Sequence, residues 1–512
     1  MIRTAAIGVI VAAMLAVARP MTSDVDGAAI LAASARTVGT PAALKARWWF
    51  VEATGRENLS AELQGLSADA PTWRPHHEWV GVDVTTDTVG WDRRTPRNDL
   101  SLRHRRFVYA AASTTIVDHA NDAAWRNAGN VPLPRRRALM RRIPHLLIKE
   151  AAALGSSAVR AHSDVKLDGR VADRVVVEFP GDGAVAIVIG RSPSVPLAAS
   201  YELYFPGRGN VTVEWRWSGW KPDAALGHVP TRHRITIDGQ LFQDVEYARY
   251  AIDDVETERF LDPPLHESHE MPAVPSWAAG TAPEAGEVAP GVHVIRVGGF
   301  TTLSAETGDG VVVFEAPEPF FGSESIPASG RSAGGTLTPQ LIEEVRKRHP
   351  GRTITQVVIS HHHGDHLGGL GTFSAAGVAA VVPSQDVAAA RRATESMPGL
   401  LQQPRASTRA VLTGVRDVAR IGGSRRDIQA INVGANPHSA GNLVLWLPAD
   451  GVMIQGDLFY FDRGSGFHPG RDRMNAFFAK WLRERGLRPK MIFGVHNRGA
   501  AGPDAIDAVG RS

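Results

Sequence analysis

The sequence predicts an α+β protein of two domains, with a β-rich N-terminal part and a C-terminal part in which strands and helices alternate. The chain has 512 residues, more than a single hydrophobic core usually holds. A proline-rich segment over residues 263–290 is the natural linker. We therefore expect an N-terminal accessory domain over residues 25–262 and a C-terminal domain over residues 291–512.

Alternating apolar and polar residues predict a series of strands in the N-terminal domain, separated by Gly, Asp and Pro. The alternation favours an antiparallel sheet with one solvated face, or an open barrel, over a parallel sheet. Trp215 and Trp217 share one strand face, which indicates an aromatic core layer; the alternative is a ligand cavity lined together with Trp220. Helices are expected over residues 42–52 and 135–154, and strands over residues 174–179, 184–189, 199–205, 211–217 and 234–237.

The C-terminal domain shows strand and helix patterns in alternation. Residues 474–485 carry apolar side chains at helical spacing, which indicates an amphipathic helix with one face in the core. Strands are expected over residues 292–297, 310–315 and 378–383, and further helices over residues 338–348 and 384–394.

Composition limits the classes of function. The net charge is only +3, and the chain contains no cysteine, so neither disulfides nor thiolate metal ligands can form. The basic run Arg135 to Arg137 with Arg141 and Arg142 could contact nucleic acid or anionic lipid. We interpret it instead as a solvated helix face, and we expect no nucleic-acid partner.

Residues 1–18 have the pattern of a signal peptide. Arg3 precedes an apolar stretch from Ala5 to Val17, and small residues end at Ala18. The stretch is shorter than the about 20 residues that a spanning helix needs, so an uncleaved anchor is the weaker alternative. We expect a periplasmic or secreted protein without stable membrane insertion after cleavage.

The segment Ser360-His361-His362-His363-Gly364-Asp365-His366 directly follows an apolar strand-like run over residues 354–359. Side chains two apart in an extended segment point to the same side, so His361 and His363 can reach one ion, whereas His362 points away. A turn at Gly364 and a helix start would direct Asp365 and His366 back toward the strand end. Imidazole and carboxylate ligands suit zinc best, with iron or manganese as alternatives.

Three further candidate ligands follow the histidine-rich segment. His438 lies in a turn before the buried run 443–447, and Asp457 and His496 each directly follow an apolar strand. A histidine-rich loop alone could be an exposed segment without metal. The recurrence of ligand-type residues at strand ends argues against that interpretation.

The order H-x-H-x-D-H, His, Gly-Asp, strand-end His resembles the metallo-beta-lactamase superfamily of hydrolases, over about residues 291–512. The resemblance implies a four-layer αβ/βα sandwich of two mixed sheets, with helices outside and two metals at one sheet edge. It implies that one metal is held by His361, His363 and His438, and the second by Asp365, His366 and His496. Asp457 would bridge the two ions.

The resemblance also implies a mechanism, in which two Zn²⁺ ions generate a hydroxide from a shared water and Asp365, the catalytic residue, orients it. The substrate expected is a small molecule with an ester, lactone, thioester or amide bond, because Gly456-Asp457 stands where several zinc beta-lactamases have a cysteine.

The alternatives are a mononuclear iron dioxygenase of the same fold, or an apolar-ligand carrier with an idle hydrolase scaffold. Tyr460, His468 and a Gly/Ser-rich stretch over residues 321–335 could border the site. The sequence does not indicate the oligomeric state.

Overall fold

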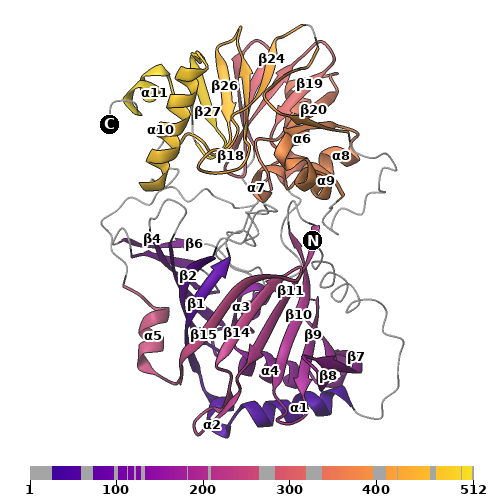
Figure 1. Cartoon of the computed structure of the whole chain (residues 1–512), viewed down its shortest axis with the longest axis vertical. Coiled ribbons are helices and arrows are strands. Elements are labelled where there is room, and N and C mark those ends of the chain that lie inside the picture. Colours follow the sequence, from indigo (N-terminus) through magenta and orange to yellow (C-terminus); the bar gives the residue numbers. More distant parts are fainter. Residues whose placement is uncertain are drawn as a thin grey trace, which may run out of the picture.

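The computed structural model (Figure 1) describes residues 26–58, 73–96, 102–111, 113–119, 123–128, 133–180, 183–205, 209–264, 283–318, 337–395, 411–423, 425–461, 469–497 and 499–509. The predicted signal peptide, the loop 321–335 and His468 lie outside the described residues, and most of the linker predicted over residues 263–290 does as well. Within the described part, no helix is long and apolar enough to cross a membrane.

The N-terminal part forms one 13-stranded antiparallel sheet with the strand order β6-β5-β4-β3-β2-β1-β15-β14-β11-β10-β9-β8-β7. The end strands β6 and β7 do not pair with each other, so the sheet is open, which confirms the predicted β-rich antiparallel domain. A separate two-stranded ribbon, β12 (Lys221–Asp223) and β13 (Gly227–Val229), accompanies it. The large sheet consists of β1 (Trp48–Asn58), β2 (Trp73–Asp83), β3 (Thr88–Pro96), β4 (Leu102–Tyr109), β5 (Ser113–Asp118), β6 (Ala123–Ala128), β7 (Val159–Leu167), β8 (Arg170–Phe179), β9 (Gly183–Gly190), β10 (Pro196–Phe205), β11 (Gly209–Ser218), β14 (Arg232–Ile237) and β15 (Gln240–Ile252).

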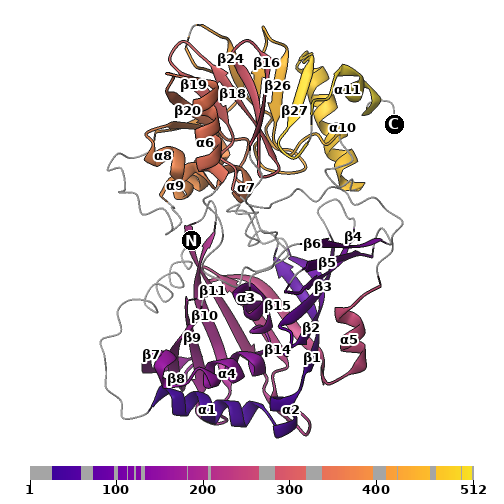
Figure 2. The same cartoon turned by 180° about the vertical axis from the view of Figure 1, so that it is seen from behind.

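Helices cover both faces of this sheet. On one face lie α1 (Gly27–Val38), α3 (Leu133–Met140) and α4 (Pro144–Ala153), in front of the strands in Figure 2. Leu147 and Ile148 of α4 are fully buried against the sheet, and burying each such side chain contributes about 1.5–3 kcal/mol. On the other face, the ring of Phe260 from α5 (Val255–Leu261) packs directly on Gly81 and Gly90. A Cβ at either glycine would lie less than 3 Å from this ring. Trp215 and Trp217 are buried in the core, as the aromatic-layer interpretation predicts.

The prediction of a helix over residues 42–52 is wrong. Only α2 (Pro41–Lys45) is helical, and β1 begins at Trp48. The run Trp48-Trp49-Phe50-Val51 is aromatic and β-branched, and its alternate residues Trp49 and Val51 bury one face of the strand. The helix expected over residues 135–154 is split into α3 and α4, because Pro144 cannot donate a backbone hydrogen bond within a continuous helix.

The interpretation of the basic run as a solvated face is wrong for three of its arginines, whereas Arg137 is partly exposed. Arg136, Arg141 and Arg142 are each at most 5% exposed. Arg141 donates two hydrogen bonds of 2.7 Å to Glu150, and Arg142 donates to both carboxylate oxygens of Glu78 at 2.9 and 3.0 Å. Because buried cations need partners, Arg141 and Arg142 pair with acidic side chains inside the domain, and Arg136 donates to the backbone carbonyls of Thr86 and Asp87 at 3.2 and 2.6 Å.

The C-terminal part is a sandwich of two mixed sheets, with seven strands in the order β16 to β22 and five in the order β23 to β27. The two sheets share one apolar core. Helix α10 (Pro469–Glu484) covers the outer face of the second sheet through Phe478 and Trp481. Helices α6 (Leu337–Arg348) and α8 (Leu370–Ala375) pack against β17 and β21 of the first sheet. Strand β25 (Leu443–Leu447) is buried on both faces of its sheet, because Leu443 and Leu445 face the shared core and Val444 faces α10. The predicted four-layer fold class is therefore confirmed.

Many C-terminal elements lie where the sequence predicts them, but β18, β22, β23, β24 and α11 were not predicted, and β16 lies inside the segment expected as linker. The strands are β16 (Glu284–Ala289), β17 (Val292–Val297), β18 (Phe300–Glu306), β19 (Val311–Phe314), β20 (Ile354–Val358), β21 (Ala379–Pro383), β22 (Leu412–Val415), β23 (Val418–Ile421), β24 (Ile428–Asn432), β25 (Leu443–Leu447), β26 (Val452–Gln455) and β27 (Met491–Gly494). The helices are α6 (Leu337–Arg348), α7 (Gly364–Leu367), α8 (Leu370–Ala375), α9 (Val387–Glu395), α10 (Pro469–Glu484) and α11 (Pro503–Val509).

Candidate metal centre

All candidate ligands of the C-terminal domain lie at one edge of the two sheets. The segment 361–366 follows β20, Asp457 follows β26 and His496 follows β27. His438 precedes β25, which runs antiparallel to β26 and therefore starts at the same edge. Gly456 permits the close approach, because a Cβ there would lie 2.5 Å from Ser360 Oγ and 3.3 Å from His361 Nδ1.

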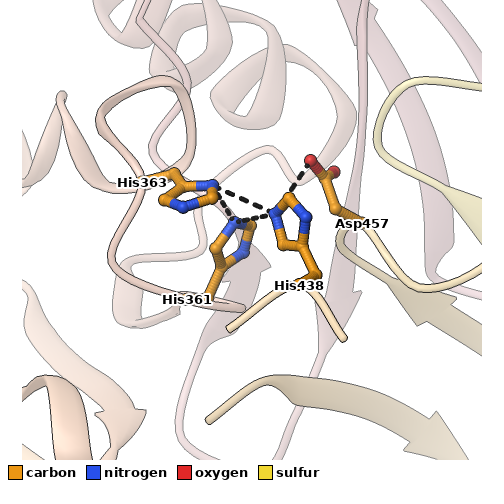
Figure 3. A group of neighbouring side chains, drawn as sticks. All are labelled: His361, His363, His438 and Asp457. Carbon is orange, nitrogen blue, oxygen red and sulfur yellow. Dashed lines mark hydrogen bonds and ion pairs between the residues drawn. The ribbon is translucent and has the colours of Figure 1, made fainter. Parts of the chain in front are cut away.

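Three imidazole nitrogens converge in the first cluster (Figure 3). His361 Nε2 lies 2.8 Å from His363 Nδ1, and His438 Nε2 lies 3.0 Å from each of these two atoms. Asp457 Oδ2 lies 3.3 Å from His438 Nε2 on the neighbouring side. The structure thus brings together the residues predicted for the first metal.

The second cluster contains Asp365, His366 and His496. The two Nε2 atoms of His366 and His496 are 3.3 Å apart, and Asp365 Oδ2 lies 3.5 and 3.3 Å from them. Asp457 Oδ1 faces the same two nitrogens at 3.3 and 3.2 Å. One oxygen of Asp457 therefore faces each cluster, the arrangement that a bridging carboxylate requires.

The chemistry of these donor sets fits bound cations. Burial, and then the neighbouring histidines, lowers the pKa of His361 and of His363 well below the usual range, so both rings are neutral with lone pairs available. Three neutral ring nitrogens within 3.0 Å cannot all be satisfied by hydrogen bonds to one another, whereas a metal ion uses all three lone pairs. In the second cluster, burial lowers the pKa of His496, but Asp457 and Asp365 outweigh it and raise this pKa to about 9. The two carboxylates thus attract positive charge to this position.

Two side chains fix which ring nitrogen of each histidine faces the centre. His361 Nδ1 lies 2.9 Å from Ser360 Oγ, which leaves Nε2 for the centre. His366 Nδ1 lies 3.0 Å from Glu315 Oε1, and Ser360 N donates to Glu315 Oε2 at 3.2 Å. Glu315 is fully buried and has a positive φ of 74°, a conformation that few non-glycine residues adopt. This residue follows β19 and was missed by sequence reasoning, which assigned no partner to the ligand histidines.

The other residues singled out near the site do not join the clusters. His362 points away from them, as predicted, and its Nδ1 lies 3.3 Å from Asp386 Oδ1. Tyr460 is buried, and its backbone N–H donates to Asn475 Oδ1 at 2.9 Å, in agreement with a packing role.

This chain is similar to known proteins in its C-terminal part. Residues 332–496 match the family model described as the metallo-beta-lactamase superfamily. Among solved structures, a metallo-beta-lactamase from Pontibacter korlensis is similar, with 18% identity, a TM-score of 0.31, and coverage of 44% of this chain and 95% of that chain. A second is the DIM-1 metallo-beta-lactamase exposed to ceftazidime, with 14% identity, a TM-score of 0.32, and coverage of 45% and 95%. No curated protein sequence gives a significant match.

The C-terminal part of this chain is a domain of the metallo-beta-lactamase superfamily, a class of metallo-hydrolases. The N-terminal sheet lies outside the matched residues.

Replacing Glu315 by Gln should weaken metal binding by about 10- to 100-fold, the usual effect of removing the partner of a ligand histidine. Glutamine keeps the shape but loses the charge that makes the His366 ring a better donor. Equilibrium dialysis of the apoprotein against buffered zinc would measure the change. Glu306→Gln is the matched control, because Glu306 Oε1 contacts His349 Nδ1 at 3.4 Å outside both clusters. Equal zinc affinity in both variants would contradict the role given to Glu315.

Proposed function

We propose that the C-terminal domain is a dizinc hydrolase that cleaves a small ester, lactone, thioester or amide substrate. The observation that carries the proposal is the position of Asp457, one oxygen of which lies 3.3 Å from His438 Nε2 while the other lies 3.2 Å from His496 Nε2. A carboxylate between two donor clusters is the arrangement that holds a pair of ions close together.

When bound, two zinc ions would supply a water of lowered pKa as the nucleophile and an electrophile for the substrate carbonyl. Asp365 is the residue of this chain placed to orient the water and accept its proton, because its Oδ2 faces the second cluster, 3.5 Å from His366 Nε2 and 3.3 Å from His496 Nε2. The same carboxyl group can return that proton to the leaving group. Ser360 and Glu315 hold the rings of His361 and His366 in place without touching the reacting atoms.

The substrate class rests on the donor set of this chain. The position after Gly456 is Asp457, and the chain has no cysteine, so the second cluster contains only imidazole and carboxylate groups. Ions held by such a site would polarise a carbonyl oxygen, so esters, lactones, thioesters and amides are the candidate substrates. Iron or manganese remains an alternative occupant of the same ligands.

The proposal is tested by elemental analysis of the full chain purified without chelator, with lactone, thioester, phosphodiester and beta-lactam substrates assayed on the same sample. At least two zinc ions per chain, together with turnover of any substrate, support it. One iron per chain with oxygen consumption would replace it by a mononuclear dioxygenase.

The competing function is an apolar-ligand carrier with an idle hydrolase domain. The complete donor sets around Asp457 weigh against an idle site, because unused ligands have no reason to converge. A carrier would bind a hydrophobic probe with the same affinity before and after metal removal, and would turn over none of the substrates.

A further inference from the structure

A second group of ligand-type side chains lies on the N-terminal sheet, in the region outside the family match. Asp92 lies on β3, His104 on β4, and His119 directly after β5. His119 N donates to His104 O at 3.0 Å, so the two histidines are neighbours across the strands, and their rings stack at 4.1 Å between centroids. Three consecutive strands therefore deliver one carboxylate and two imidazoles to the same patch of the sheet.

The carboxylate of Asp92 is buried, and only one of its two oxygens is hydrogen-bonded. The residue is 2% exposed, and its Oδ2 accepts from Arg106 Nε at 3.0 Å and lies 3.1 Å from His119 Nε2. Its Oδ1 has no hydrogen-bond partner, although His104 Nε2 lies 3.2 Å away without the angle of a hydrogen bond. A buried unpaired carboxylate oxygen is costly, so its position beside two imidazole nitrogens requires an explanation.

We propose that Asp92 Oδ1, His104 Nε2 and His119 Nε2 form a further transition-metal site, separate from the centre in the C-terminal domain. Zinc bonds to nitrogen and oxygen are about 2.0–2.2 Å long, so two ligands of one tetrahedral ion lie about 3.4 Å apart. Asp92 Oδ1 lies 3.2 Å from His104 Nε2, close to that value, and His119 Nε2 lies 3.1 Å from the other oxygen, Oδ2, of the same carboxylate. One ligand atom from each of the three residues lies within 4.8 Å of the other two.

The chemistry of the cluster selects the kind of ion. Arg106 occupies Oδ2 and offsets the charge of Asp92, so the attraction for an oxygen-preferring ion such as Mg²⁺ or Ca²⁺ is weak. Two imidazoles favour Zn²⁺, Ni²⁺ or Cu²⁺. His119 is exposed, which gives the ion access from solvent. Because the ligands come from β3, β4 and the end of β5, the ion would tie together three strands near one edge of the sheet.

The test counts zinc bound per full-length chain after removal of metal and dialysis against a low zinc concentration. The variants His104→Ala and His119→Ala should each hold one zinc ion fewer than the wild-type protein. The matched control is His77→Ala on β2, since His77 pairs with Glu52 at 2.9 Å rather than with Asp92. This control should bind as much zinc as the wild-type protein.

A double variant, His361→Ala with His438→Ala, separates this site from the C-terminal centre. This double variant should retain the zinc ion that depends on His119, and this result does not depend on whether the variant still hydrolyses any substrate. Equal zinc content in the wild-type protein and in both N-terminal variants would overturn the proposal and leave a hydrogen-bonded charge cluster. Should His104→Ala fail to fold, His119→Ala decides the question, because His119 is exposed and lies outside the strands.

Discussion

Replacing Asp365 by Asn should lower the turnover of any substrate of the C-terminal domain by about 10²- to 10⁴-fold, the contribution of a positioned proton acceptor. Asparagine has nearly the same shape, but its amide cannot accept the proton of an attacking water and is a poorer partner for His496, whose Nε2 lies 3.3 Å from Asp365 Oδ2. Initial rates measured with the best substrate of the panel would give the loss, and circular dichroism would report whether the fold is kept.

His361→Ala should abolish turnover as well, by a different route. His361 Nε2 is within 3.0 Å of both other imidazoles of the first cluster, so its loss removes one of three converging donors. Zinc content should then fall together with activity. His293→Ala on β17 serves as the control, since this histidine belongs to neither cluster. Full activity in both Asp365→Asn and His361→Ala would rule out the proposed hydrolase.

The candidate ligands could be predicted because each has a local signal. His361 and His363 are two apart after an apolar strand, and Asp457 directly follows another. Strand ends that meet at one sheet edge then bring distant residues together, which the structure now displays as two clusters. The positions thus followed from the pattern, while the metal-binding role of each residue stays a prediction.

Residues defined by long-range contacts had no such signal. Glu315 is 51 residues before His366, and a single glutamate after a strand does not indicate a histidine partner. Arg142 looked solvent-facing because its partner Glu78 lies 64 residues earlier in the chain. Trp48 to Val51 carry a local strand signal, but the strand continues to Asn58 through pairing with β2 and with β15, and the β15 partners are about two hundred residues away. Local propensity decides little where such pairing is available.

Arg142 offers the largest expected effect on stability. It is 5% exposed and donates two hydrogen bonds to Glu78, whose oxygen also accepts from Trp91 Nε1 at 3.1 Å. Burial raises the pKa of Glu78, but Arg142 and His76 outweigh it and hold this pKa well below the usual range, so the carboxylate is charged. Arg142→Met should therefore lower the free energy of unfolding by about 3–5 kcal/mol, because a buried charge loses its partner. Urea unfolding followed by tryptophan fluorescence measures this change, since most tryptophans lie in the N-terminal part.

Two further variants decide whether the loss comes from the uncompensated charge. Arg137→Met is the matched control on α3, because Arg137 is a partly exposed partner of Asp87 and should cost only about 0–1 kcal/mol. The double variant Glu78→Gln with Arg142→Met removes both charges and keeps an acceptor for Trp91, so it should be more stable than Arg142→Met alone. A double variant as unstable as the single one would mean that lost packing, rather than the buried carboxylate, accounts for the effect. In that case the Arg142 side chain would stabilise the domain through its packing contacts rather than through its charge.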